Sequence, residues 1–388
     1  MLAAVQAPSI SPSASLDYSV FKKAVLNACK VIDKGNTIPV LDTLLITSVR
    51  GGCHIFGTDL DLCTTTFVPG PSHPDFVTVI DAHKLKGVMD KVTDAARISF
   101  EVREDEKLLV TIGKVNLTLM QDIPRNDFPE DLSFRTNLRT SNASFAIPSS
   151  TLATILQKVR FAISTEETRY YLNGVLMHLD EHAKNLAFVA TDGHKLARYQ
   201  IDIPAGAEAA PTFSIIPRKT VEEVYRMVSR KGCPEQTQIT VTETAISFRI
   251  GEDEFLESKL IDGTFPDYQR VIPTRNEHKV AIRTEGFITS LKQATAIKST
   301  KDKAAKLSFS PNKVVITCQD VDFGAASTEM VAFHDVTLEV GMNANYLGEI
   351  LKQLDGGAML EMQDPGAPVI IKDGADDGVT YVLMPLRV

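Results

Sequence analysis

The chain has 388 residues, 44% of them hydrophobic and 23% charged, with a formal net charge of −8 at pH 7. These values are ordinary for a globular protein of about two to four domains, and they exclude a protein coated in basic charge. No apolar run approaches the roughly 20 residues of a membrane-spanning helix, so we expect a cytoplasmic protein with no membrane partner. The five scattered cysteines form no CxxC pair, which argues against structural zinc or a disulfide framework.

The first 15 residues lack the basic start and long apolar core of a signal peptide, and we interpret them as a short extra tail. After this tail, two segments in each third of the chain carry apolar residues at i, i+3, i+4 and i+7. This spacing predicts helices that bury one face only. The six apolar stripes are Phe21–Ile32, Leu85–Val92, Leu152–Ile163, Val221–Val228, Phe287–Thr295 and Leu347–Leu354.

The segments between these helices also repeat. Asp59, Asp192 and Asp320 each follow one apolar run and precede another, and alternating apolar and polar residues around them predict antiparallel strands. The matched order predicts an α+β protein of three repeated domains, each with two helices packed on antiparallel sheet. Polar stretches near residues 135–142 and 273–278 mark the boundaries. The predicted domains are 1–139, 140–273 and 274–388.

The turn at Asp192 and Gly193 places His194 and Lys195 at the start of a strand, where their side chains can face a partner. An enzyme could combine Asp192 and His194 with a serine nucleophile, either Ser164 or Ser258. However, the sequence has no GxSxG, HExxH, P-loop or GxGxxG motif, and nothing in it supplies an oxyanion hole. We therefore predict a non-catalytic protein with no catalytic residues, cofactor or metal.

Positive charge is concentrated on the predicted helices. Six helical windows (16–34, 81–93, 149–164, 217–231, 285–306 and 343–354) hold 20 Lys and Arg against nine Asp and Glu, although the whole chain is acidic. Lys and Arg without interleaved aromatic residues suit phosphate contacts with duplex DNA, independent of sequence and weakened by salt. The residues expected to face DNA are Lys22, Lys23, Lys30, Lys84, Lys91, Lys158, Arg160, Arg218, Lys219, Arg226, Lys292 and Lys298.

Five motifs, in this order, resemble the β subunit of bacterial DNA polymerase III, the β sliding clamp or processivity factor. The resemblance covers about residues 16–388. Its most specific parts are Arg169-Tyr170-Tyr171-Leu172-Asn173-Gly174, Thr191-Asp192-Gly193-His194-Lys195-Leu196, Pro217-Arg218-Lys219, the run from Ser258 to Tyr268, and Met384-Pro385-Leu386-Arg387. Lys195 stands where the family commonly has Arg, and Leu386 replaces a common Met.

The resemblance implies a head-to-tail homodimeric ring, of which this chain forms half, with helices around double-stranded DNA and sheets outside. It implies a nucleoid-associated protein that tethers the replicative polymerase catalytic subunit for processive DNA replication. It further implies docking of the clamp loader, translesion polymerases, mismatch repair proteins and ligase through clamp-binding peptides. Ring closure would join the first domain to the third domain of the other copy, through Leu117, Leu119 and Ile297.

The resemblance also implies a cleft for partner peptides between the second and third domains. Its apolar wall would suit varied ligands, and His194 and Arg387 could hydrogen-bond a peptide. The implied cleft residues are Leu172, Thr191, Gly193, His194, Lys195, Leu196, Pro266, Arg270, Val271, Tyr346, Val382, Met384, Pro385, Leu386 and Arg387. The alternative is a repeat-built peptide-binding scaffold without DNA binding, which would have no need of basic helices.

Overall fold

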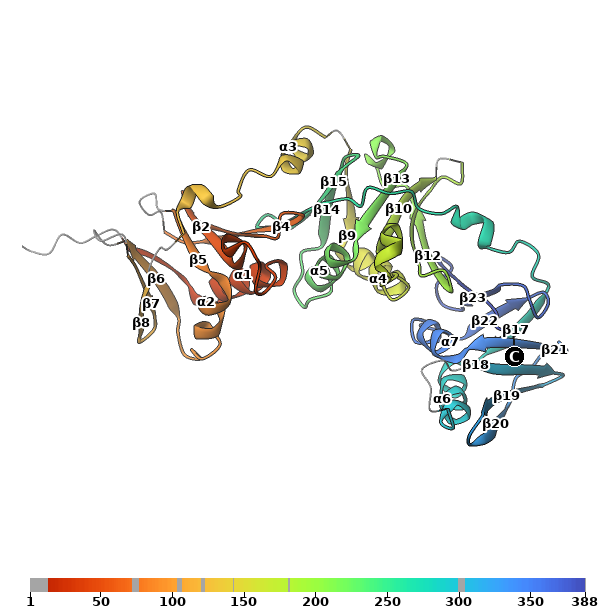
Figure 1. The fold of residues 1–388 in the computed structure, drawn as a ribbon. Helices are drawn as coiled ribbons and strands as arrows, with labels where there is room; N and C mark the ends of the chain where they lie inside the picture. Colours follow the sequence, from red (N-terminus) through yellow and green to blue (C-terminus); the bar gives the residue numbers. More distant parts are fainter. Residues whose placement is uncertain are drawn as a thin grey trace, which may run out of the picture. The chain divides into compact units, whose positions relative to one another are not determined.

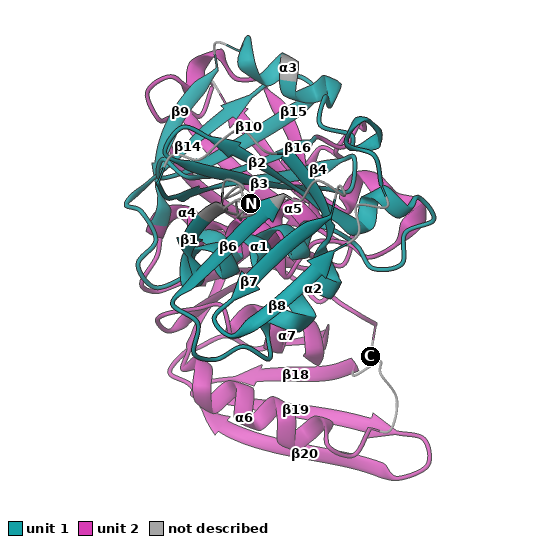
Figure 2. Cartoon of the chain, turned by 90° about the vertical axis from the view of Figure 1, so that its left-hand side faces the viewer, with its two compact units in different colours: residues 1–149, 226–259 teal, residues 150–225, 260–388 magenta. Residues whose placement is uncertain are grey.

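The computed structural model describes residues 13–71, 77–102, 107–119, 123–141, 143–180, 182–298 and 304–387. It contains two compact units, coloured separately in Figure 2. Unit 1 comprises Met1–Ser149 and Arg226–Lys259, and unit 2 comprises Ser150–Tyr225 and Leu260–Val388. The middle third of the chain contributes to both units. The predicted domain boundaries therefore stay a prediction, because these units group the chain differently.

One order of elements occurs three times along the chain: a strand, a helix, four strands, a second helix and three strands (Figure 1). This confirms the predicted α+β repeat of two helices with antiparallel sheet in each copy. The first copy comprises β1 (Ser13–Asp17), α1 (Tyr18–Val31), β2 (Thr43–Val49), β3 (Gly52–Thr58), β4 (Leu62–Pro69), β5 (Val77–Asp81), α2 (Ala82–Met89), β6 (Arg97–Val102), β7 (Leu108–Ile112) and β8 (Val115–Leu119).

The second and third copies follow the same order. The second comprises β9 (Ser144–Pro148), α4 (Ser149–Arg160), β10 (Gly174–Asp180), β11 (Asn185–Thr191), β12 (Lys195–Asp202), β13 (Phe213–Pro217), α5 (Arg218–Val228), β14 (Gln236–Val241), β15 (Ala245–Ile250) and β16 (Glu254–Lys259). The third comprises β17 (His278–Ile282), α6 (Thr284–Thr295), β18 (Ala304–Ser310), β19 (Lys313–Asp320), β20 (Gly324–Val331), β21 (Leu338–Asn343), α7 (Ala344–Leu351), β22 (Ala358–Met362), β23 (Val369–Asp373) and β24 (Val379–Leu383).

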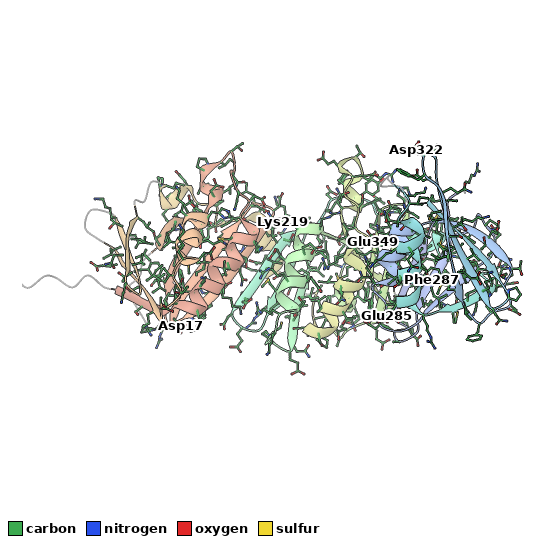
Figure 3. The ribbon with its side chains drawn as sticks, turned by 90° about the horizontal axis from the view of Figure 1, so that it is seen from below. Asp17, Lys219, Glu285, Phe287, Asp322 and Glu349 are labelled. Atoms are coloured by element: carbon green, nitrogen blue, oxygen red, sulfur yellow. The ribbon has the colours of Figure 1, made fainter. Side chains whose placement is uncertain are left out.

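Polar side chains at the ends of strands start three of these helices. The carboxylate of Asp17, labelled in Figure 3, accepts hydrogen bonds from the backbone N–H groups of Ser19 and Val20 at 2.9 and 3.1 Å. Asp81 caps α2 and Asn343 caps α7 in the same way. Such caps satisfy backbone donors that have no partner within the helix, so each helix begins directly after its strand.

The apolar stripe of α1 packs into the core of unit 1, as its spacing predicts. Phe21, Ala24, Val25 and Ala28 are buried, and the ring of Phe21 lies 5.2 Å from that of Phe100 in β6. Burying an aliphatic or aromatic side chain of this size contributes about 1.5–3 kcal/mol, so this face holds the helix on the sheet.

The three predicted aspartate turns share one hydrogen-bond pattern. Each aspartate carboxylate accepts two backbone N–H groups that follow it: Asp59 bonds residues 61 and 62, Asp192 bonds residues 194 and 195, and Asp320 bonds residues 322 and 323. Gly193 has a φ of 89°, which glycine adopts without steric cost. The turns therefore set where β4, β12 and β20 begin.

Among the residues that the structure describes, the strand pairs are antiparallel, and two eight-stranded sheets join consecutive copies of the repeat. In unit 1, β4 pairs with β16, and in unit 2, β12 pairs with β24. The fourth strand of one copy thus pairs with the last strand of the next copy. The sheet orders are β1-β6-β7-β8 and β5-β2-β3-β4-β16-β15-β14-β9 in unit 1, and β13-β10-β11-β12-β24-β23-β22-β17 and β20-β19-β18-β21 in unit 2.

The predicted polar boundary at residues 135–142 overlaps a helix, α3 (Ser133–Arg139), that the sequence pattern did not predict. Phe134 and Leu138 share one face of it and are buried in a core cluster with Leu45 and Phe56. Arg135 extends toward β16 and donates to the Glu257 carboxylate at 2.8 Å. This linker is therefore packed onto the sheet of unit 1 by a short i, i+4 apolar pair.

None of the helices in the described part of the chain is long and apolar enough to cross a membrane.

A buried carboxylate reinforces the β4–β16 joint. Glu254, at the start of β16, receives two hydrogen bonds from Arg230, at 2.5 and 2.7 Å, and one from Lys23 of α1 at 2.9 Å. Burial alone would raise the pKa of Glu254, but hydrogen bonds from Arg230 and Lys23 outweigh it and lower that pKa below its ordinary value of 4.5. The charged network links α1 to a strand of the next copy.

We predict that Glu254→Gln lowers the free energy of unfolding at pH 7 by about 2–4 kcal/mol, because it leaves two cations without their charged partner. A carboxyl with a depressed folded pKa stabilises above its unfolded pKa and loses that contribution as pH falls through its folded pKa. The gap between wild type and variant should therefore close below about pH 4.5. Urea unfolding at several pH values, with exposed Glu252→Gln as control, tests this; a gap that is independent of pH would contradict it.

Candidate functional site

An apolar cleft of about 270 Å³ lies within unit 2. Four stretches form it: the 3-10 helix Glu167–Leu172, the turn between β11 and β12, the 3-10 helix Tyr268–Val271 with the residues before it, and the chain around the end of β24. Ten of the fifteen predicted cleft residues line it: Leu172, Thr191, Gly193, His194, Lys195, Leu196, Pro266, Val271, Val382 and Met384.

The cleft has a buried apolar floor and an accessible rim. Leu172, Leu196 and Val382 are 4%, 4% and 2% exposed, whereas Val271 and Met384 are 42% and 39% exposed. The floor is fixed by sheet pairing, because Leu196 of β12 and Val382 of β24 are cross-strand partners. A rim of exposed apolar side chains around such a floor can bury further apolar surface of a ligand.

Backbone hydrogen bonds hold the end of the chain beside this floor. The Met384 N–H donates to the His194 carbonyl at 3.0 Å, and the Leu386 N–H donates to the Gly341 carbonyl at 2.8 Å. The apolar residues after β24 are therefore attached to the site on two sides. These bonds explain why an apolar run stands at the end of the chain: its backbone is fixed beside the cleft.

Five predicted cleft residues do not line the apolar cleft: Arg270, Tyr346, Pro385, Leu386 and Arg387. The Arg270 side chain is 85% exposed and pairs with Asp267 at 2.7 Å. Tyr346 of α7 instead lines a neighbouring polar hollow of about 430 Å³, which shares His194 and Lys195 with the cleft. Tyr346 therefore contacts His194 and Lys195, which line the cleft, without lining the cleft itself.

Four cleft residues were absent from the prediction: Arg169, Tyr171, Asp267 and Tyr268. All four lie inside motifs that carried the family resemblance, so that signal could have identified them. The Tyr268 hydroxyl bonds the Nδ1 of His178 at 2.8 Å, which fixes one side of the cleft. A Cβ at Gly193 would lie 2.9 Å from the Arg169 guanidinium, so a side chain there would displace that arginine.

The Lys195 side chain is buried and held by several groups. Its ammonium lies 2.7 Å from Asp192, 3.3 Å from Glu349 and 4.3 Å from the centre of the Tyr346 ring. Burial alone would lower the pKa of Lys195, but the two carboxylates outweigh it and raise that pKa above its ordinary value. Lys195 is therefore a fixed cation in the wall between the cleft and the polar hollow.

The predicted DNA-facing residues lie on or beside five helices, including Lys219 on α5, labelled in Figure 3. Lys23, Lys30, Lys84, Lys91 and Lys292 are exposed, and all the others except Lys158 are half-buried. Several also form ion pairs: Lys23 with Glu254, Lys84 with Asp81 and Arg160 with Glu222. That these side chains share one surface stays a prediction.

The prediction that Lys158 faces DNA is wrong. The residue is 1% exposed, and its ammonium lies 2.7 Å from Asp355 and 3.1 Å from Asp373. It also donates to the Gln353 carbonyl. An ammonium enclosed in this way cannot reach a phosphate without leaving two carboxylates. Lys158 therefore joins α4 to the third copy instead of facing DNA.

Leu117 and Leu119, predicted at the dimer interface, lie half-buried on β8 and line a hollow of about 520 Å³ in unit 1. Apolar residues of β5 and α2, including Ile80 and Leu85, form its other walls. β8 is the end strand of its sheet, as β20 is in unit 2. Ile297 follows α6 and is half-buried.

No group of three or more His, Cys, Asp or Glu side chains with metal-binding geometry occurs among the residues that the structure describes.

Comparison with known proteins gives matches along nearly the whole chain. Three family models match in order: DNA polymerase III beta subunit, N-terminal domain (15–132), central domain (146–267) and C-terminal domain (269–387). The beta sliding clamp of Caulobacter vibrioides strain NA1000 is 33% identical over 385 residues, covering 96% of this chain and 99% of the relative. That of Escherichia coli K12 is 28% identical over 354 residues, covering 90% and 93%.

Solved structures agree with these sequence matches. A DnaN sliding clamp from Bartonella birtlesii, bound to griselimycin, is 33% identical with a TM-score of 0.90 and covers 97% of this chain and 100% of its own. A DNA polymerase III subunit beta from Pseudomonas aeruginosa is 25% identical with a TM-score of 0.87 and the same coverage.

We predict that Lys158→Met lowers the free energy of unfolding by about 3 kcal/mol, because it leaves the buried Asp373 carboxylate without its cation. Exposed Lys352→Met is the control and should change stability little. Urea unfolding measures both. Binding of folded Lys158→Met to duplex DNA should equal that of wild type at every salt concentration; a shallower salt dependence would return Lys158 to the DNA-facing set.

Proposed function

The chain belongs to the family of DNA polymerase III beta subunits, the β sliding clamps, and on that premise we propose how its own residues hold DNA and partner proteins. A sliding clamp is a non-catalytic processivity factor that keeps a polymerase on DNA during replication. The observation that carries this function is the match of all three clamp domains, in order, over nearly the full length of the chain.

We propose that two copies close into a ring around duplex DNA and that the exposed lysines of the helices contact its phosphates. Lys30, Lys91 and Lys292 are exposed, one in each of three helical regions. Phosphate contacts made by lysine release counterions and carry no sequence information, so the ring can slide and its hold weakens with salt. Retention on DNA then depends on the closed ring more than on affinity.

The repeat suggests how the ring closes. Within the chain, the fourth strand of a copy pairs with the last strand of the next copy, as β4 with β16 and β12 with β24. The fourth strand of the third copy, β20, and the last strand of the first copy, β8, both end their sheets. We therefore propose that β20 of one protein chain pairs antiparallel with β8 of a second, identical chain. Two identical seams of this kind would close a head-to-tail ring of two chains.

The aspartate turns fix the register of this proposed seam. The third residue after the aspartate is Leu62 in the first repeat and Lys195 in the second, and these residues face Ser258 and Leu383. In the third repeat this residue is Phe323, directly before β20. Counted from the hairpin before the last strand, the corresponding residue of β8 is Leu119. Phe323 of one chain would then face Leu119 of the other chain, and Ala325 would face Leu117 of the other chain. Phe323 is 70% exposed in the single chain. The proposed pairing would place its ring beside the apolar hollow that Leu117 and Leu119 line.

We propose that the apolar cleft binds short peptide segments of partner proteins, the polymerase catalytic subunit first. The clamp loader, translesion polymerases, mismatch repair proteins and ligase would compete for the same cleft, since its buried floor and methionine rim suit varied apolar side chains. Griselimycin, which the Bartonella clamp binds, would occupy the cleft as well. A tethered polymerase gains a high effective concentration at the primer end.

Ring closure is tested on circular DNA. We predict that the protein, once loaded, stays on nicked circular DNA during gel filtration and is lost after linearisation, because a ring slides off a free end. Leu117→Asp should lower the dimer fraction by at least tenfold, because it puts a charge into the apolar seam. Light scattering measures the dimer, with exposed Asn116→Asp as matched control. Equal retention on linear and circular DNA would favour the alternative without a ring.

Removing the five residues after Leu383 tests the cleft. We predict that this truncation weakens griselimycin and polymerase binding by at least tenfold, because it removes Met384 together with its backbone hydrogen bond to the His194 carbonyl. The dimer should remain, since β8 and β20 are unchanged. Calorimetry with griselimycin and light scattering give the two measurements. A truncated protein that is monomeric but binds griselimycin normally would overturn this assignment.

A further inference from the structure

The wall between the apolar cleft and the polar hollow is built by two segments far apart in the sequence. His194 comes from the β11–β12 turn, and Tyr346 comes from α7. Their rings are stacked, with centroids 5.8 Å apart and planes at 21°. His194 lines the cleft on one side of this stack, whereas Tyr346 lines only the polar hollow behind it. The position of His194 in the cleft thus depends on α7.

Lys195 links the same two segments beneath the stack. Its ammonium is over the Tyr346 ring and bonds the Asp192 carboxylate within its own turn. Besides this ring contact, Lys195 forms a 3.3 Å ion pair with Glu349, which lies one helical turn after Tyr346 on α7. Figure 3 labels Glu349 on this helix. Asp192 therefore fixes the lysine within its turn, and Glu349 attaches that turn to the helix.

We propose that Glu349 is a positioning residue for the peptide cleft: through Lys195 it keeps the Tyr346 ring stacked on His194 and so holds the cleft wall in its binding shape. Glu349 is not one of the residues that line the cleft. The inference rests on the proposed function, since it concerns the affinity of that cleft.

Exposure sets the size of the effect. The Glu349 side chain is 45% exposed, so water screens its pair with Lys195, although the lysine side chain itself is 7% exposed. Ion pairs with one solvent-exposed partner contribute only a small interaction free energy. Ligand affinity should accordingly fall by about three- to fivefold when the pair is broken, with most of the change in the dissociation rate.

The same hollow supplies a matched control. Glu222 of α5 also lines it, its side chain is 43% exposed, and it bonds Arg160 at 2.7 and 3.0 Å. Glu222→Gln therefore removes the same charge, at nearly the same exposure, from the same hollow, but leaves the ion pair between Lys195 and Glu349 of α7 intact.

Calorimetry with griselimycin compares Glu349→Gln with Glu222→Gln in the dimeric protein. We expect a three- to fivefold weaker Kd for the first variant and an unchanged Kd for the second. In the Lys195→Met background, Glu349→Gln should have no further effect, because the pair is already broken. Equal Kd values for wild type and Glu349→Gln, or equal losses in both single variants, would overturn the proposal.

Ring spectra of the free protein test the inference without any ligand. In protein labelled at the histidine rings, with the His194 signal assigned by His194→Gln, we expect Glu349→Gln to shift that signal as the stack with Tyr346 loosens, and Glu222→Gln to leave it in place. A weaker Kd with an unmoved His194 signal would reduce Glu349 to a general stability role. If wild type itself fails to bind griselimycin, the proposed cleft function fails, whereas the ring spectra still decide the role of Glu349.

Discussion

Antiparallel pairing between the fourth strand of one repeat and the last strand of the next is the interaction on which the structure depends. It makes a continuous hydrogen-bonded sheet from segments that are distant in sequence, as β4 with β16 and β12 with β24. Pairing of this kind satisfies the backbone groups of both edges at once, so neither edge is left open within a unit. A buried ionic contact accompanies each joint: Glu254 with Arg230 and Lys23 in unit 1, and Asp373 with Lys158 in unit 2.

The apolar cleft is a consequence of the second joint. Its floor includes Leu196 and Val382, which face each other across the β12–β24 pair, and its wall begins at the turn that starts β12. Because the sheet fixes the floor, this part of the cleft is formed by the fold itself. What the sheet does not fix is the wall of His194 and Tyr346, which relies on contacts with α7.

Basic residues on the helices divide between two tasks. Lys158 stabilises a joint from inside the protein, and Lys23 pairs with Glu254 while its side chain stays half exposed. Lys30, Lys91 and Lys292 are exposed and suit contacts with phosphates. Lysines on or beside the helices thus have different surroundings, and the difference depends on whether a carboxylate from the neighbouring repeat lies within reach.

The sequence by itself determined the helices of the repeat and the aspartate turns, because these features depend on residues that are close together along the chain. The apolar stripe from Phe21 predicts a helix with one buried face, and the aspartates at 59, 192 and 320 predict turns, because both signals depend on neighbours a few residues away. The run from Thr191 to Leu196 likewise pointed to the cleft. Only the tertiary structure decided that Lys158 is buried, that Phe134 and Leu138 make a linker helical, and that Glu349 reaches Lys195. Each of these depends on partners far along the chain, and a lysine or glutamate on a helix has the same local pattern whether solvent or an opposite charge surrounds it.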